Sequence, residues 1–357
     1  MESIDVTAEP KSLGWRIVHI FHPAPPAAVM IDDPTEIREK SRYWRRRILI
    51  GTIVGYAVFY LVRKNLSTAM PVMEKSLGIS KTGLGLFLSL HGVLYGISKF
   101  FNGFLGDRAN ARYFMATGLL LSALMNLIFG WTSLSIVMGI AWMLNGWFQG
   151  MGFPPCARLL SHWFTPKELV TKFSIWNASH SIGAATIMIM GGYLALINWR
   201  LCFFMPAAIA LICVVYLLFT LRDTPQSLGL PPIDDADAVE AAHQDAPFWP
   251  LLKQYVFSNK FIWILSVANF FVYTIRYAFL DWGMTLLDQS KHIKLSHGGK
   301  PMPWNQPLSI QTMPMASTVE LKPKLIFRSA EQSSPAAMKN RAFARSPTIP
   351  LRNLDGP

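Results

Sequence analysis

Three long stretches without charged side chains constrain this chain more than any other feature. No Asp, Glu, Lys or Arg lies between Arg112 and Arg158, between Lys172 and Arg200, or between Arg200 and Arg222. Each stretch has room for one or two bilayer-spanning helices of about 20 residues. Apolar residues make up 52% of the chain and charged residues only 15%. We therefore predict an all-α polytopic membrane protein, and this composition argues against a soluble enzyme.

Hydropathy predicts seven transmembrane spans, at approximately residues 47–70, 83–105, 112–131, 133–157, 170–196, 199–221 and 259–287. Residues 1–46 form a charged N-terminal tail without the apolar core of a signal peptide. Residues 222–258 are polar and acidic, and we expect them to be a solvated cytoplasmic loop. Six helices, a long loop and a seventh helix are the layout of a two-bundle transporter that is entering its second half.

Basic residues indicate how the helices are oriented. They are frequent before the first span and after the second and fourth, and rare in the loops between. This alternation predicts a multi-pass membrane protein with a cytoplasmic N-terminus. We expect the membrane to be the cell inner membrane. The net charge of +12 thus marks one membrane face and the tail, and does not indicate binding to nucleic acid.

Residues 288–357 do not continue this pattern. They are rich in proline and basic residues and lack a long apolar run, which predicts a disordered tail. We expect that this tail replaces an incomplete second bundle, so that the chain is C-terminally truncated or frameshifted. A single bundle cannot form both walls of an alternating-access path, so such a chain would be inactive alone.

Four cations lie away from the ends of the predicted spans and are candidate substrate-binding residues: Arg63 and Lys64 in the first, Lys99 in the second and Arg276 in the seventh. An unpaired cation at the centre of a membrane helix costs about 2.5–3.5 kcal/mol. Asp281 is the one obvious acid at similar depth in these spans, so an anionic substrate would balance the excess charge. Arginine's planar fork suits phosphate oxygens. The alternatives are snorkelling, above all for Lys64, or a pair between Arg276 and Asp281.

Two histidines and three cysteines also lie in apolar spans. His180 in the fifth span could hydrogen-bond a substrate, although a lone buried histidine is more often a core residue. We expect His91 in the second span to be structural. Cys156, Cys202 and Cys213 lack the spacing of metal ligands and are expected to pack in the core. The sequence predicts no catalytic residue, no metal site and no cofactor.

A short motif follows the second span, with glycines at 103 and 106 and charged residues at 107, 108 and 112. It resembles the signature between helices 2 and 3 of the major facilitator superfamily. The resemblance implies a conformational latch formed by Gly103, Gly106, Asp107, Arg108 and Arg112. The alternative is an ordinary charged turn.

Several further stretches of the sequence occur in the order in which they occur in one family of this superfamily, and they make the resemblance more specific. The chain resembles the organophosphate:inorganic phosphate antiporters of this superfamily, which include glycerol-3-phosphate and hexose-phosphate transporters and a related sensor. The marks are residues 60–65, 98–100, 106–108, 110–114, 149–158, 176–183, 222–232, 276 and 281–283. The resemblance ends near residue 283.

The resemblance implies how such a protein works. Arg63 and Arg276, one from each bundle, would grip phosphate near the midplane, with Lys99 and His180 assisting. Inorganic phosphate and an organic phosphate ester would exchange as the bundles rock around this site in the lipid bilayer. Two alternatives stay open: a sensor of external sugar phosphate that signals to a histidine kinase, and an inactive fragment.

Overall fold

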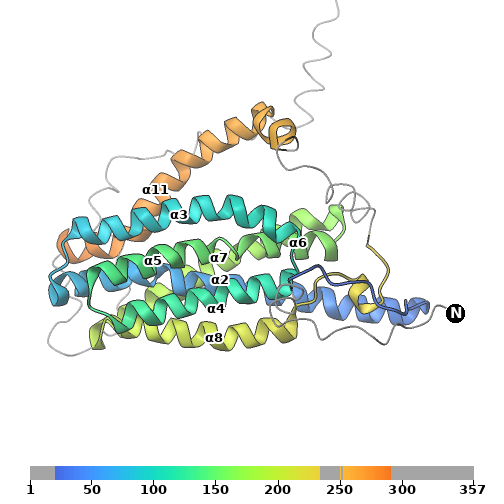
Figure 1. Ribbon diagram of the computed structural model, residues 1–357, viewed down its shortest axis with the longest axis horizontal. Coiled ribbons are helices and arrows are strands. Elements are labelled where there is room, and N and C mark those ends of the chain that lie inside the picture. The colour runs from blue at the N-terminus through green and yellow to red at the C-terminus, as the bar shows by residue number, and fades with distance from the viewer. Residues whose placement is uncertain (1–20, 234–249, 251, 291–357) are drawn as a thin grey trace, which may run out of the picture. The chain divides into compact units, whose positions relative to one another are not determined.

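The computed structural model describes residues 21–233, 250 and 252–290, and within these ranges it is helical with no strand (Figure 1). The predicted tail 288–357 and the acidic part of the 222–258 loop lie almost wholly outside the described residues. The helices, in chain order, are α2 (Pro34–Leu77), α3 (Lys81–Asp107), α4 (Ala111–Trp131), α5 (Ser135–Gln149), α6 (Phe153–Trp163), α7 (Pro166–Ile197), α8 (Leu201–Thr220), η1 (Gln226–Leu228), η2 (Leu252–Phe257) and α11 (Lys260–Ser290).

Capping side chains and turn residues fix several helix ends. Asp33 accepts hydrogen bonds from the amides of Thr35 and Glu36 at the start of α2, and Gly78 ends this helix with a φ of 65°. Ser80 caps α3 and Asn110 caps α4 in the same way as Asp33. These short, capped connections reverse the direction of the chain, and the most extensive helix packing is between elements that are not consecutive, such as α2 with α7 and α4 with α8.

In the described part of the chain, six helices are long and apolar enough to cross a membrane: α2, α3, α4, α7, α8 and residues 260–283 of α11. The predicted fourth span, 133–157, is divided into α5 and α6 by a turn at Gly150–Gly152. Glycines lower helix stability there, and Pro154 and Pro155 are tolerated only because they begin α6. The expected all-α membrane architecture is therefore confirmed, with this break added.

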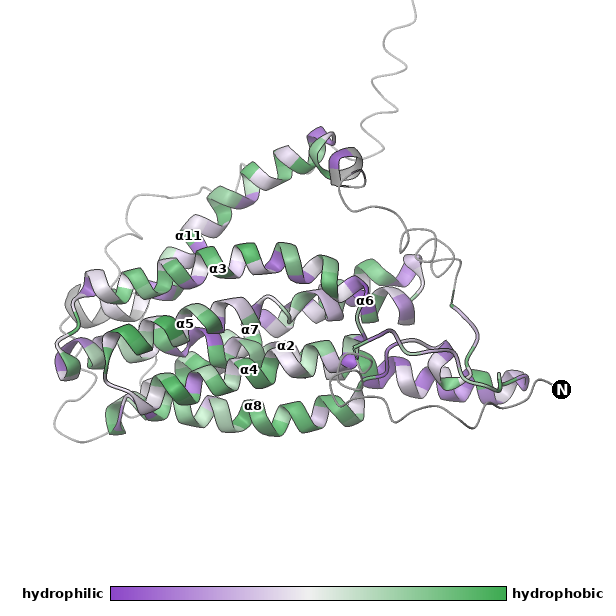
Figure 2. Ribbon diagram, in the orientation of Figure 1, coloured by the Kyte–Doolittle hydropathy of each residue, from purple (hydrophilic) through white to green (hydrophobic). Residues whose placement is uncertain are grey.

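Helix α2 is the central element of the bundle. It packs against α4, α7 and α8, and α11 contacts it along part of its length (Figure 1). Its hydrophilic first turns, which precede the predicted first span, extend beyond the apolar part of the bundle (Figure 2). Two apolar clusters hold the helices together, one around Phe59 and Trp163 and the other around Trp142 and Phe203.

The start of the 222–258 loop is not the solvated linker that the sequence predicts. Asp223 is 1% exposed and Leu230 2% exposed, and both pack against the bundle. Asp223 accepts hydrogen bonds from the backbone amides of Ala24 at 3.0 Å and Ala111 at 2.8 Å. A buried carboxylate with such partners is stable away from water, which explains why an acidic sequence is buried here.

Candidate functional site

Arg63 lies in the buried middle of α2 and is the centre of the candidate site. Its side chain is 6% exposed, and its guanidinium carbon lies 4.0 Å from the ring centre of Tyr60 and 4.9 Å from that of Tyr95. The faces of these two tyrosine rings attract a cation without neutralising its charge. Nε of Arg63 has no hydrogen-bond partner among the described residues. A buried arginine is thus held in place, and no carboxylate among residues 21–233 and 252–290 balances its charge.

Three asparagines fix the stretch of α2 that carries Arg63. The carbonyl of Val62 accepts hydrogen bonds from Asn126 at 2.9 Å and from Asn145 at 3.0 Å. Asn65 donates to Asn126 Oδ1 at 2.7 Å and to the carbonyl of Cys202 at 2.9 Å. Because these bonds join four helices around one turn of α2, the rotation of Arg63 about the helix axis is set by the core.

Lys99 and His180 join Arg63 through the same tyrosines. Lys99 Nζ lies 4.7 Å from the ring centre of Tyr95, on the ring that also contacts Arg63. The His180 ring lies 5.2 Å from the Tyr60 ring, and its Nδ1 is 2.9 Å from the carbonyl of Asn177. Since a carbonyl only accepts, this bond places the ring hydrogen on Nδ1 if the ring is neutral. Helices α2, α3 and α7 therefore contribute to one cluster.

Arg276 approaches this cluster from α11. It is partly buried, and its guanidinium carbon lies 5.7 Å from the ring centre of Tyr273 on the same helix. It does not pair with Asp281, which was one alternative from the sequence. We call Arg63, Lys64, Lys99, Arg276 and His180 the cation cluster.

Lys64 is the member of the cation cluster that has a carboxylate. Its Nζ lies 2.5 Å from Asp281 Oδ1, and Ser67 donates to the same oxygen at 3.2 Å. The Tyr277 ring centre lies 4.3 Å from Lys64 Nζ. Lys64 therefore does not snorkel: it joins α2 to α11, and the cost of burying its charge is offset by this pair.

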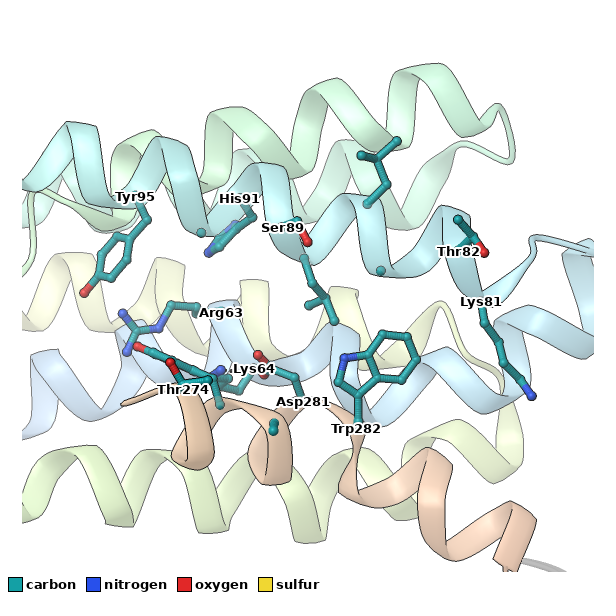
Figure 3. Close-up of a pocket in the computed structure, with 16 residues that line it drawn as sticks. Arg63, Lys64, Lys81, Thr82, Ser89, His91, Tyr95, Thr274, Asp281 and Trp282 are labelled. Carbon is teal, nitrogen blue, oxygen red and sulfur yellow. Dashed lines mark hydrogen bonds and ion pairs between the residues drawn. The ribbon is translucent and has the colours of Figure 1, made fainter. Parts of the chain in front are cut away.

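A cavity of about 950 Å³ lies between α2, α3 and α11 beside this pair (Figure 3). Its polar lining includes Arg63, Lys64, His91, Tyr95 and Asp281. Lys99, His180 and Arg276 are not among its lining residues. The cavity has the volume of a small-molecule site, and several of its lining side chains are polar.

The cluster carries more positive charge than the described residues balance. Arg63, Lys99 and Arg276 make no ion pair with a described carboxylate, while Asp281 is occupied by Lys64. Arg63 is buried and Arg276 is partly buried, whereas Lys99 is exposed. A buried, unbalanced charge is costly in an apolar bundle, and an anion bound beside Arg63 would lower that cost. Arg63 in particular presents donors only, which suits the oxygens of an oxyanion.

The motif at the end of α3 is arranged differently from the sequence expectation. A Cβ added to Gly106 would lie 2.8 Å from Pro154 Cβ, so the start of α6 packs closely against α3 at this glycine. Nothing lies within 4 Å of a Cβ added to Gly103. Arg108 stacks on Phe104 at 3.9 Å and Arg112 lies 5.0 Å from the Tyr113 ring centre. Gly106 is therefore a point of close helix approach in this structure, and Gly103 is not.

The buried charges at this end belong to Arg158 and Asp223, which the sequence analysis did not single out. Arg158 Nε lies 3.6 Å from Asp223 Oδ1, and Arg158 also donates to the backbone carbonyl of Asp107. Asp223 in turn accepts from the first amide of α4, at Ala111. We call Arg158, Asp223 and these backbone partners the paired end. Nearby, burial and the charges of Arg112 and Arg47 lower the pKa of Arg222.

Comparison with known proteins decides the family. The Major Facilitator Superfamily profile matches residues 52–316. The chain belongs to the Major Facilitator Superfamily. It is a multi-pass membrane protein, as the sequence predicts. Its fold is also similar to that of a bacterial homolog of the human lysosomal transporter Spinster in an inward-facing conformation, with a TM-score of 0.57 and 16% identity, covering 71% of this chain and 57% of that one.

Several curated relatives carry names that state what they transport or sense. The chain is 42% identical to the glycerol-3-phosphate transporter of Bacillus subtilis, over 77% of this chain and 64% of the relative. It is 41% identical to the probable hexose phosphate transport protein of Chlamydia muridarum, over 76% and 63% of the two chains. It is 37% identical to the membrane sensor protein UhpC of Escherichia coli, over 77% and 64%. The chain spans less than two thirds of the length of these relatives, which are transporters and a sensor and not enzymes.

Proposed function

We propose that the cation cluster binds the phosphate group of a phosphorylated polyol or sugar, and that the protein exchanges such an ester for inorganic phosphate by alternating access. The observation that carries the proposal is Arg63, a 6% exposed guanidinium with no described carboxylate beside it. A phosphate dianion bound there would replace water as the partner of several donors at once. The relatives named for glycerol 3-phosphate and hexose phosphate support this choice of anion.

Each residue of the cluster then has a distinct task. Arg63 and Arg276 grip the phosphate oxygens from α2 and α11, because a guanidinium donates two parallel hydrogen bonds. Lys99 adds charge, and His180 is positioned beside Tyr60 to donate or accept one hydrogen bond. Lys64 is held by Asp281 in this conformation and becomes available to an anion only if that pair opens.

We also place the protein in the cell inner membrane with its N-terminus in the cytoplasm. The support for the orientation is that arginines are frequent in the first turns of α2 and around the α3–α4 turn. Figure 2 shows the first turns of α2 as a hydrophilic end of the bundle. The paired end lies there as well. Gly106, Asp107, Arg108 and Arg112, together with Arg158 and Asp223, would act as the latch that closes this end during exchange.

Phosphate binding by the full chain in lipid nanodiscs tests the proposal. Radiolabelled inorganic phosphate should bind to the unmodified chain, and Arg63→Lys should weaken binding at least about tenfold, because lysine retains the charge but loses the planar fork. Arg38→Lys is the matched control, since Arg38 lies on the exposed start of α2. Equal affinity in the unmodified chain and Arg63→Lys would contradict the proposed role of the fork.

A sensor is the second candidate, because the similarity to UhpC is of the same order as that to the transporters. Liposomes loaded with phosphate separate the two functions. Uptake of glycerol 3-phosphate that depends on internal phosphate supports exchange. Binding without uptake, together with a ligand-dependent change in the phosphorylation of a co-expressed histidine kinase, supports the sensor. Absence of both binding and uptake is the result for an inactive fragment.

A further inference from the structure

His91 lines the same cavity, and only part of its environment fits the structural role that the sequence predicts. It lies on α3, one turn before Tyr95, and is 7% exposed. Its ring centre lies 5.1 Å from that of Trp142 and 6.4 Å from that of Tyr95, nearly parallel to both. In Figure 3 the ring projects from α3 to the side of the cavity where Arg63 and Tyr95 are also seen.

The hydrogen bond of one ring nitrogen determines the chemistry of the other. Nδ1 lies 3.0 Å from the backbone carbonyl of Trp142. Because a carbonyl oxygen only accepts, Nδ1 must carry the hydrogen, and Nε2 of the neutral ring is then an acceptor. Stacking against Trp142 and Tyr95 supports this orientation of the ring. Nε2 is buried and has no hydrogen-bond partner among the residues that the structure describes.

A buried acceptor beside a group of cations has a restricted choice of ligand atoms. Phosphate ester oxygens bear negative charge, and the nitrogen lone pair repels them. Arg63 and Lys64, on the same cavity, offer donors only and are suited to those oxygens. What Nε2 can receive is a hydrogen-bond donor without charge, and the carbon skeleton of a phosphorylated polyol or sugar supplies hydroxyl groups.

We propose that His91 Nε2 accepts a hydrogen bond from a hydroxyl group of the organic part of the substrate, and that it thereby favours hydroxyl-bearing phosphate esters over alkyl phosphates. This inference rests on the proposed function, since it assumes that the phosphate group binds at Arg63. His91 is then a specificity-determining residue on α3, and it is separate from the cations that hold the phosphate.

Competition binding with the full chain in nanodiscs tests this assignment. Radiolabelled inorganic phosphate is displaced either by glycerol 3-phosphate or by propyl phosphate, which has the same chain length and no hydroxyl. We expect glycerol 3-phosphate to compete better than propyl phosphate in the unmodified chain. His91→Asn should reduce this preference by about tenfold. The amide nitrogen of the new asparagine can replace Nδ1 at the Trp142 carbonyl, but the asparagine has no atom in the position of Nε2. His91→Gln, which places its amide near the position of Nε2, should retain more of the preference.

The preference is a ratio measured within one variant, so a lower yield of folded protein does not alter it. A ratio that is unchanged in His91→Asn overturns the inference, and so does an unmodified chain that shows no preference between the two esters. Either result leaves phosphate binding at Arg63 intact. Failure of the unmodified chain to bind phosphate at all overturns the proposed function, and the inference with it.

Discussion

Arg63 and Arg158 are buried to the same degree, each 6% exposed, but their surroundings are opposite. Arg158 at the paired end lies against the carboxylate of Asp223 and the carbonyl of Asp107. Arg63 in the cation cluster lies against tyrosine rings and an open cavity. The difference teaches that burial alone does not mark a functional cation. Within the part of the chain that the structure describes, the cation that joins helices at the paired end has a carboxylate, and the arginine that we assign to a ligand has none.

A substitution at the paired end should have the largest effect on the stability of the protein. Asp223→Ala should lower the free energy of unfolding by about 3–5 kcal/mol, because it removes the buried carboxylate that lies against the Arg158 guanidinium and that accepts from the amides of Ala111 and Ala24. The measurement is denaturant unfolding of the purified protein in detergent. Glu36→Ala is the control: it breaks an exposed pair with Lys40 and should change stability by less than about 1 kcal/mol. Equal effects of the two substitutions would contradict the contrast.

The pair between Lys64 and Asp281 is the intermediate case, since it is a neutralised pair inside the cation cluster. Asp281→Asn should lower the free energy of unfolding by about 2 kcal/mol, because it leaves Lys64 unpaired beside Arg63. Adding Lys64→Met should recover most of that loss, since neither charge then remains. If the double variant lost as much unfolding free energy as Asp281→Asn and Lys64→Met lose together when measured singly, the pair would not contribute to stability.

The sequence predicted the helices better than the contacts between them. Spans without charged residues gave an all-α bundle, because the bilayer requires long apolar helices. The break between α5 and α6 was masked by the apolar residues on both sides of Gly150–Gly152, since hydropathy does not register a turn. The buried carboxylate of Asp223 was missed because an acid after a helix end usually indicates solvent.

At the site, residue type was predictable and pairing was not. Arg63, Lys99 and Arg276 are conspicuous as charges in apolar helices, and this alone identifies them. Asp281 could have paired with Arg276 on its own helix or with Lys64 on another, and only the packing of α11 against α2 decides for Lys64. The asparagines that hold Val62, and Tyr60 and Tyr95 under Arg63, carry no sequence signal that separates them from core residues.

The central claim is that Arg63 in the cation cluster binds an anion whereas Arg158 at the paired end stabilises the fold. The most direct test removes each of these two charges in turn. Arg63→Met and Arg158→Met are compared by thermal unfolding in detergent, with and without saturating inorganic phosphate. We expect Arg158→Met to lower the unfolding temperature and to keep the stabilisation by phosphate. Arg63→Met should leave the unfolding temperature unchanged or raise it, because an uncompensated charge is lost, and should abolish the stabilisation by phosphate. If Arg63→Met destabilised the protein as much as Arg158→Met and phosphate still stabilised it, the account would be wrong.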